Sequence, residues 1–287
     1  IVFHVKKYKF FLVNAFSLPA DSPYLHRPVE GPKEVRLMNY DMVKDHLGDV
    51  DWDLHHGATA TYGDWPVENR EEFALASAAR IPIVREACES QKYNAIVLLG
   101  GGEPGFFECR EIGLKFGIPV TACAYSQMHF ATLLGNKFSV IDMAESHNMY
   151  YYNLIIQHRF DSRCASLRNI NYPLPRPGGD PERSINKEKE IALNGGNSNM
   201  VNTAIAEAVS AIEEDGAEVI TFGCSALFWL KPFVRNGLLE LGWDVPILEG
   251  YSCAIELAKS MVNLDIDASS LMFPPDHPSK WRRKKVF

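Results

Sequence analysis

One cysteine of this 287-residue chain stands where a thiol could do chemistry. Cys224 follows the apolar run 218–222 through Gly223, and the apolar stretch 226–230 comes directly after it. This pattern predicts a strand that ends in a tight turn and leads into a helix. A thiol at such a turn faces the free amides of a helix N-terminus, whose partial positive charge favours the thiolate, the form that acts as base or nucleophile. Position alone leaves a second interpretation open, in which Cys224 is a buried small hydrophobe.

A glycine-rich loop is the second feature with chemical potential. It covers residues 100–105 and follows the apolar run 95–99. Its bare amides could bind an anion or stabilise an oxyanion. Nucleotide binding is disfavoured, because Pro104 lies inside the loop, a Walker lysine is missing, and no acid stands at the distance that a dinucleotide fold requires. A small carboxylate or a carbonyl oxygen fits this loop better.

The remaining polar candidates are less specific. Asp142, Glu145 and His147 follow the apolar run 138–141, and they form either a polar wall of a cleft or a solvated loop. The other five cysteines fit better as core or surface filler than as reactive groups, and they are Cys88, Cys109, Cys123, Cys164 and Cys253. Since the cysteines form no CxxC pair and suit no zinc knuckle, we predict no metal site.

The elements that must position these residues alternate along the chain. Apolar runs without polar alternation, typical of strands buried on both faces, occur at 10–13, 95–99, 119–122, 138–141, 218–222 and 246–248. Between them, helical spacing covers 201–212 and 124–131. Strand and helix in alternation predict an α/β fold. The unit of strand, glycine loop, helix and proline-led strand occurs twice, so we expect two similar halves with ligands at the carboxyl ends of the strands.

Composition narrows the class of protein. The chain has 29 Lys and Arg against 36 Asp and Glu, and this net charge of −7 disfavours nucleic-acid binding. A basic tail, 280–285, is more typical of a solvated terminus than of a phosphate site. No apolar run is long enough for a membrane span. Sparse cysteines without a scaffold pattern predict free thiols and a cytoplasmic location. The segment 173–199, poor in apolar residues, is a surface loop or an active-site lid.

Blocks spread over residues 8–280 resemble the hydantoin racemases of the aspartate/glutamate/hydantoin racemase superfamily. The strongest block is 212–220, which runs into Gly223-Cys224. The other blocks are Asn14 and residues 102–105, 117–120, 128–129, 134–140, 163–168 and 269–275.

The resemblance implies two Rossmann-like halves with an active site in the cleft between them, and no cofactor. It implies an isomerase that moves a proton at the carbon α to a carbonyl of a hydantoin-like or small carboxylic substrate. In this family two cysteines, one from each half, remove and return the proton on opposite faces. The second of these cysteines corresponds to Cys224. The first corresponds to Gly100, which has no thiol.

The missing thiol leaves several hypotheses open. Glu103 or Cys109 could supply the second base, substrate or water could serve, or the enzyme does not racemise. Arylmalonate decarboxylase, a relative in the superfamily, resembles this chain in having glycine at the first position and cysteine at the second. In that relative the single cysteine protonates one face of the enediolate left after loss of carbon dioxide. A further alternative is a catalytically inactive protein that binds small anions.

We therefore expect an α/β fold with two pseudo-symmetric halves, each a mainly parallel sheet flanked by helices. Residues 6–122 with 255–287 would form the first half, and 123–254 the second. Cys224 is the expected acid/base. The expected substrate-binding residues are Asn14, Gly100, Gly101, Glu103, Asp142 and Ser225, with Asn14 and the amides of Gly100, Gly101 and Ser225 on the oxyanion. The expected partner is a small-molecule substrate, and homo-oligomerisation is implied by the family alone.

Overall fold

The structure is a computed structural model that describes residues 7–273, 276 and 280–283, so Lys284 and Lys285 of the basic tail lie outside the described residues. Its strands are β1 (Tyr8–Val13), β2 (Val50–His55), β3 (Ala95–Leu98), β4 (Val120–Ala122), β5 (Phe138–Asp142), β6 (Cys164–Asn169) and β7 (Val219–Phe222). Its α-helices are α1 (Lys33–Arg36), α2 (Tyr40–Val43), α3 (Arg70–Glu89), α4 (Phe106–Phe116), α5 (Cys123–Leu134), α6 (Glu145–Gln157), α7 (Ile185–Leu193), α8 (Asn199–Glu213), α9 (Lys231–Glu240) and α10 (Gly250–Leu264).

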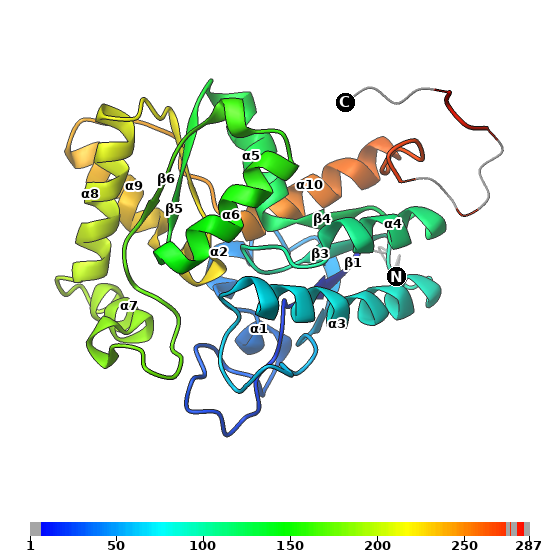
Figure 1. Cartoon of the computed structure of the whole chain (residues 1–287), viewed down its shortest axis with the longest axis horizontal. Helices are drawn as coiled ribbons and strands as arrows, with labels where there is room; N and C mark the ends of the chain where they lie inside the picture. The colour runs from blue at the N-terminus through cyan, green and yellow to red at the C-terminus, as the bar shows by residue number, and fades with distance from the viewer. Residues whose placement is uncertain (1–6, 274–275, 277–279, 284–287) are drawn as a thin grey trace, which may run out of the picture.

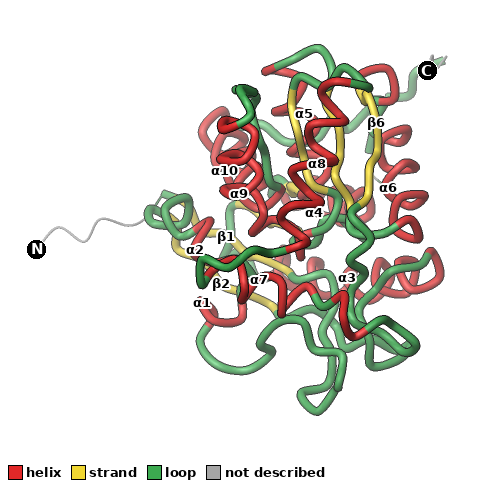
Figure 2. The backbone as a smooth tube through the Cα atoms, turned by 90° about the vertical axis from the view of Figure 1, so that its left-hand side faces the viewer, coloured by secondary structure: helices red, strands yellow, loops and turns green. Residues whose placement is uncertain are grey.

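The strands form two parallel sheets. The first has the order β2-β1-β3-β4 and the second the order β6-β5-β7. Figure 1 shows β1, β3 and β4 with α3 and α4 on one side of the molecule, and β5 and β6 with α8 and α9 on the other. In the turned view of Figure 2, β6 and α8 stand above β1 and β2. The predicted α/β fold with parallel sheets flanked by helices is confirmed.

Buried strands explain why the apolar runs lack alternation. Every residue of β3 and of β7 is buried, because helices cover both faces of a parallel sheet. The predicted helices at 124–131 and 201–212 are present as α5 and α8. Ser198 caps α8 by accepting a hydrogen bond from the Val201 amide, and buried alanines on one face pack this helix onto the second sheet.

Two parts of the chain differ from the sequence-based prediction. The run 246–248 is not a full strand, since only Ile247 forms a bridge, to Ile220. The segment 173–199 is more than a loop, because it contains α7. Only Ile185, Glu188 and Ala192 of α7 are buried, so its apolar face is too narrow to be recognised from periodicity.

Helix α10 returns the chain to the first sheet. It packs against β3, β4 and α5, and Glu249 caps it by accepting hydrogen bonds from the Tyr251 and Ser252 amides. It therefore spans residue 254, where the sequence placed a boundary. The division of the chain into 6–122 with 255–287 and 123–254 stays a prediction. None of the helices among the described residues is long and apolar enough to cross a membrane.

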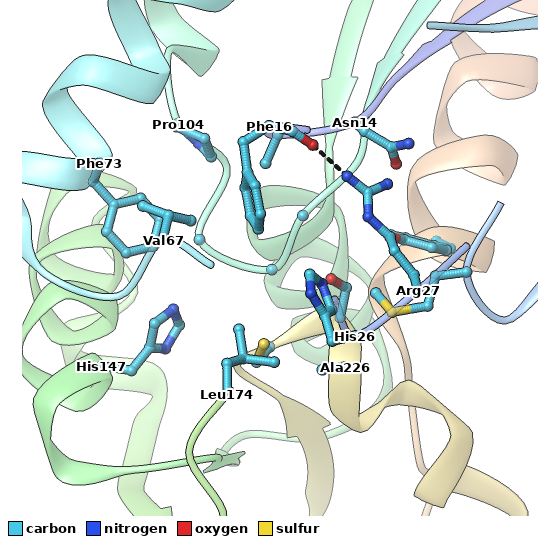
Figure 3. A pocket seen from close by; sticks show the side chains of 18 residues that line it. Asn14, Phe16, His26, Arg27, Val67, Phe73, Pro104, His147, Leu174 and Ala226 are labelled. Atoms are coloured by element: carbon cyan, nitrogen blue, oxygen red, sulfur yellow. Dashed lines mark hydrogen bonds between the residues drawn. The ribbon is translucent and has the colours of Figure 1, made fainter. Parts of the chain in front are cut away.

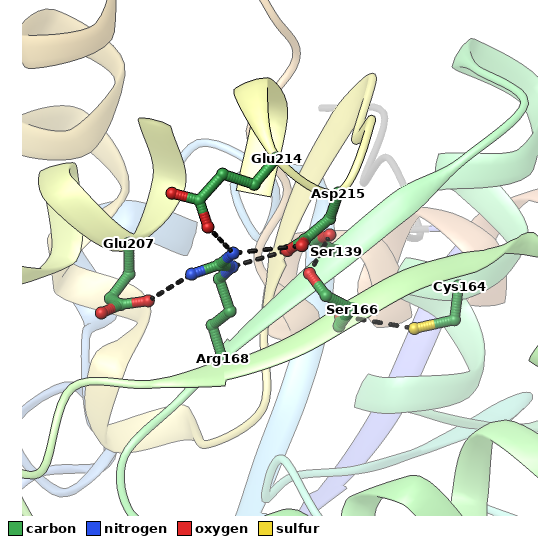
Figure 4. A network of polar contacts seen from close by, with 7 residues as sticks. All are labelled: Ser139, Cys164, Ser166, Arg168, Glu207, Glu214 and Asp215. Atoms are coloured by element: carbon green, nitrogen blue, oxygen red, sulfur yellow. Dashed lines mark hydrogen bonds and ion pairs between the residues drawn. The ribbon is translucent and has the colours of Figure 1, made fainter. Parts of the chain in front are cut away.

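An ion-pair cluster joins β6 to the C-terminal end of α8. Arg168 lies 2.6 Å from Asp215, 2.8 Å from Glu214 and 3.2 Å from Glu207, as Figure 4 shows. These carboxylates raise the pKa of Arg168 above its usual value. The cluster ties two of the blocks that carry the family resemblance to each other, 163–168 and 212–220.

Candidate active site

A cavity of about 40 Å³ lies at the carboxyl ends of three strands, as the sequence predicts for ligand sites in parallel sheets (Figure 3). Asn14 follows β1, Gly100 follows β3 after one residue, and Cys224 follows β7 after one residue. Strands from both sheets thus contribute to one cavity. Of the expected site residues, Asn14, Gly100, Gly101, Cys224 and Ser225 line it, whereas Glu103 and Asp142 do not.

The two loops after β3 and β7 touch through their backbones. A Cβ atom at Gly101 would lie 2.2 Å from the Gly223 carbonyl oxygen and 2.7 Å from the Cys224 Cα. Any side chain there would push the loops apart. Glycine at this position therefore sets the distance between the glycine loop and the Cys224 thiol.

Arg80 of α3 fixes the glycine loop through hydrogen bonds to backbone carbonyls. Its guanidinium donates hydrogen bonds to the carbonyl oxygens of Leu99 (2.5 Å), Pro104 (2.9 Å) and Val13 (3.2 Å). These carbonyls belong to both ends of the loop and to the end of β1. Arg80 is 1% exposed and pairs with no carboxylate among the described residues, so its positive charge next to the glycine loop is not neutralised by an ion pair. Burial lowers the pKa of Arg80 to about 10, so it is cationic at neutral pH.

The Cys224 thiol is protonated at neutral pH. Burial raises its pKa to about 12, and the nearby Asp142 carboxylate adds to the rise, while the Ala226 amide opposes it. The expectation that helix amides favour the thiolate is wrong for this state of the molecule. Only a 3₁₀ segment, η3 (Ser225–Leu230), follows Cys224, and desolvation outweighs its single amide. The Cys224 thiol thus carries a proton at the cavity, and the Ala226 amide lies within reach of its sulfur.

The amides of the glycine loop are not equivalent. The Gly100 amide interacts with the buried Cys123 thiol and opposes the rise in pKa that burial causes there, and its part in binding an oxyanion stays a prediction. The amides of Gly101 and Gly102 make no hydrogen bond to any described residue, and both glycines line the cavity. Gly102 is covered by Phe73, whose ring stacks on Tyr150 with centroids 3.7 Å apart. Gly101 and Gly102 are thus the donors available to a bound anion.

Glu103 points away from the cavity, contrary to the sequence-based prediction. Its carboxylate accepts hydrogen bonds from the Tyr125 amide at 2.9 Å and from His158 Nε2. Both side chains of the Glu103–His158 pair are 1% exposed. Glu103 therefore positions the loop rather than the substrate. Cys109 does not line the cavity either, because this residue of α4 is fully buried in the core, and burial raises its pKa to about 12.

Asp142 acts on the cavity through His147. The Asp142 carboxylate is fully buried and accepts hydrogen bonds from His147 Nδ1 at 2.6 Å and from the Met143 amide at 2.8 Å. A proton on Nδ1 leaves Nε2 as the free acceptor of the ring. His147 lines the cavity, and its Nε2 has no partner among the described residues. Of the residues predicted to form a polar wall, His147 lines the cavity, and Asp142 hydrogen-bonds to it from outside the lining.

Sequence reasoning missed His26 and Arg27, which line the same cavity. They lie in the irregular segment between β1 and α1, where no periodicity or motif marks them. Arg27 donates a hydrogen bond to the Phe16 carbonyl oxygen (Figure 3). Burial lowers the pKa of His26 to about 3, and the neighbouring Arg27 cation contributes. His26 is therefore neutral at ordinary pH, so it is a poor base. Within the described ranges, no three metal-ligating side chains gather into a possible metal site.

Sequence comparison relates the chain to racemases. The model of the family Asp/Glu/Hydantoin racemase matches residues 55–258. A hydantoin racemase of Paenarthrobacter aurescens is 26% identical over 203 residues, which cover 71% of this chain and 76% of that protein. A hydantoin racemase of Pseudomonas sp. (strain NS671) is 26% identical over 183 residues, and the match spans 64% of each chain.

Solved structures share the fold at low identity. Allantoin racemase from Klebsiella pneumoniae aligns with a TM-score of 0.64 at 19% identity, over 96% of this chain and 97% of that one. A double mutant of arylmalonate decarboxylase aligns with a TM-score of 0.55 at 10% identity, over 88% and 92%. These likenesses support the fold, and the family match covers most of the chain. The chain belongs to the Asp/Glu/hydantoin racemase family.

Proposed function

We propose that this protein is a cofactor-independent racemase or epimerase that moves a proton at the carbon α to a carbonyl group. The observation that carries the proposal is that the lining of one cavity includes both a protonated thiol, Cys224, and an unpaired imidazole nitrogen, His147 Nε2. A racemase of this kind needs one acid and one base on opposite faces of a planar intermediate. His147 then takes the place that Gly100 leaves empty.

The proposed proton transfers start from the His147–Asp142 hydrogen bond and the buried Cys224 thiol. His147 Nε2 takes the α-proton, the electron pair of the C–H bond forms the C=C bond of an enolate, and the π pair of the C=O bond moves onto the oxygen. The amides of Gly101 and Gly102, with the Asn14 side chain, stabilise the resulting enolate oxygen. The enolate carbon then takes the proton of the Cys224 thiol on the other face, which leaves a thiolate and an imidazolium. Asp142 stabilises the imidazolium, and reverse turnover or proton exchange with water restores both groups.

The test follows optical rotation and deuterium incorporation together. Each enantiomer of 5-benzylhydantoin and of hydantoin-5-acetate is incubated in deuterium oxide with the wild type, Cys224→Ser and His147→Gln. The wild type should incorporate deuterium at C5 as rotation is lost, and each variant should lose racemisation by at least 100-fold. Racemisation within about tenfold of wild type, near 1.4 kcal/mol in barrier, would remove that residue from the mechanism.

Matched variants separate chemistry from folding. Cys164→Ser changes a half-buried cysteine of β6 outside the cavity. His46→Gln removes the histidine of another His–carboxylate pair, which lies 2.8 Å from Glu256 at the surface. Both variants should keep wild-type turnover. A loss of turnover in either of them as large as in the cavity variants would show that the assay reports folding.

A decarboxylase of the arylmalonate type is the second candidate, and the absence of a thiol at Gly100 favours it. Here Cys224 alone donates a proton to the enediolate after loss of carbon dioxide. Phenylmalonate separates the two functions. If His147→Gln releases carbon dioxide at the wild-type rate and Cys224→Ser does not, the decarboxylase is correct. A protein that binds anions without turnover would act on none of these compounds.

The cytoplasmic location and the homo-oligomer stay predictions.

A further inference from the structure

We propose that the substrate carries a carboxylate group, which pairs with Arg27 on the wall of the cavity. This inference rests on the proposed function for the position of the reacting carbon, and it narrows the substrate to small carboxylic acids or ring compounds with an acidic arm. Arg27 is thereby a specificity-determining residue.

The charge distribution of the cavity carries the first step. Its ionisable lining consists of His26, Arg27, His147, Cys224 and Tyr251. No Asp or Glu lines it, in a chain whose net charge is −7. His26 is neutral because its pKa is lowered to about 3, and Cys224 is neutral because its pKa is raised to about 12. Arg27 is the one side chain of this lining that is charged at all ordinary pH values.

The Arg27 guanidinium uses few of its hydrogen-bond donors within the protein. Its hydrogen bond goes to the Phe16 carbonyl oxygen, and its guanidinium lies 5.6 Å from the centre of the Phe16 ring. It forms no ion pair with any carboxylate of the described residues. By contrast, the buried Arg80 donates hydrogen bonds to three carbonyls, and Arg176 is paired with Glu68 and Glu72. A guanidinium has five N–H donors, so most of those on Arg27 are left for a ligand.

Burial makes this arrangement costly without an anion. Arg27 is partly buried, and desolvation lowers its pKa from the usual value. A partly desolvated cation without a counter-ion gains from pairing with an anion, and a bound carboxylate supplies that partner. Guanidinium and carboxylate match in shape, and they form paired charge-assisted hydrogen bonds. A neutral hydantoin offers no charge for this group.

The experiment compares two probes that differ in charge alone. Binding of hydantoin-5-acetate and of its neutral amide is measured by isothermal titration calorimetry at pH 7. The proteins are the wild type, Arg27→Gln, Arg27→Lys and Arg235→Gln, the last a control at a half-exposed arginine of α9. The wild type and the control should bind the acid at least tenfold more tightly than the amide. Arg27→Gln should bind both equally, and Arg27→Lys should keep part of the preference.

The outcomes separate this inference from the proposed function. Equal binding of the acid and the amide by the wild type, or no binding of either probe, overturns the assignment of Arg27. An unchanged preference in a folded Arg27→Gln protein overturns it as well. Cys224→Ser should retain the preference without proton exchange. If the wild type prefers the acid but exchanges no proton at C5, the carboxylate site stands and the proton-transfer function fails. If it exchanges the proton without charge preference, the reverse holds.

Discussion

Gly101→Ala tests whether the two catalytic loops meet through their backbones. The new Cβ would lie 2.2 Å from the Gly223 carbonyl oxygen, whereas a carbon and an oxygen in contact stay about 3.3 Å apart. The loops must therefore separate by roughly 1 Å, and a displacement of this size at a reacting group costs about 100-fold in rate. Since φ of Gly101 is not in the left-handed region, the backbone itself accepts alanine, and the effect comes from the contact.

The stability change follows from the same geometry. Overpacking of this kind costs about 1–3 kcal/mol. For a chain of this size that corresponds to a fall in Tm of roughly 2–10 °C. Thermal unfolding measures the loss of stability, and deuterium exchange at the α-carbon of the substrate measures the loss of rate, both on the same protein preparation.

A matched control isolates the contact. Gly216→Ala places a Cβ in open space at φ +77°, so it introduces backbone strain without a clash. It should lower Tm while leaving the turnover of the folded protein intact. Gly101→Ala should lower both. A Gly101→Ala protein with wild-type Tm and wild-type exchange would refute the direct contact between the loops.

Three further predictions concern other parts of the molecule. Gly100→Cys should lower stability by about 1–3 kcal/mol in chemical unfolding, because φ is +107° and the Cβ would lie 2.9 Å from the Ala15 Cβ. Adding Ala15→Gly should recover part of the loss. Full stability of Gly100→Cys alone would contradict the strain. Because His26 has its pKa lowered to about 3, the protein loses stability as pH falls from 6.5 to 3, by at most about 2 kcal/mol at pH 5, and His26→Gln should flatten this part of the Tm profile. Arg168→Gln leaves its acidic partners, among them Asp215, without a cation, and it should lower stability by about 1–3 kcal/mol, which Tm at low and high salt measures. Deuterium exchange of the substrate should stay unchanged in this variant.

Local pattern predicted the elements and the position of Cys224. Apolar runs without alternation identified β3 and β7, and the turn after β7 placed the thiol at a strand end. The same pattern predicted the wrong ionisation of Cys224. The pKa of a buried thiol depends on desolvation and on Asp142, whose carboxylate comes from another strand. Neither quantity can be read from the neighbours of Cys224 in the sequence.

The residues that the sequence missed act over long separations. Arg27 reaches the cavity from an irregular segment, and Arg80 reaches the glycine loop from the middle of α3. Neither stands in a motif, so only the folded chain shows their role. Glu103 failed for a related reason, because its partner His158 follows it by 55 residues and draws the carboxylate away from the cavity. Residues within one loop can thus differ completely in their access to the cavity.

Arg80 also couples the assembly of the glycine loop to the docking of α3. The carbonyls of Leu99 and Pro104 are satisfied by a side chain from this helix, so the loop cannot reach its final hydrogen bonding before α3 is in place. We therefore expect the loop and the helix to open together, as one cooperative unit, during fluctuations of the native state. In native-state hydrogen exchange, the protected amides around residues 99–105 should respond to denaturant with the same slope as those of α3. The cavity is consequently built in the step that docks α3, and it exists only when that docking is complete.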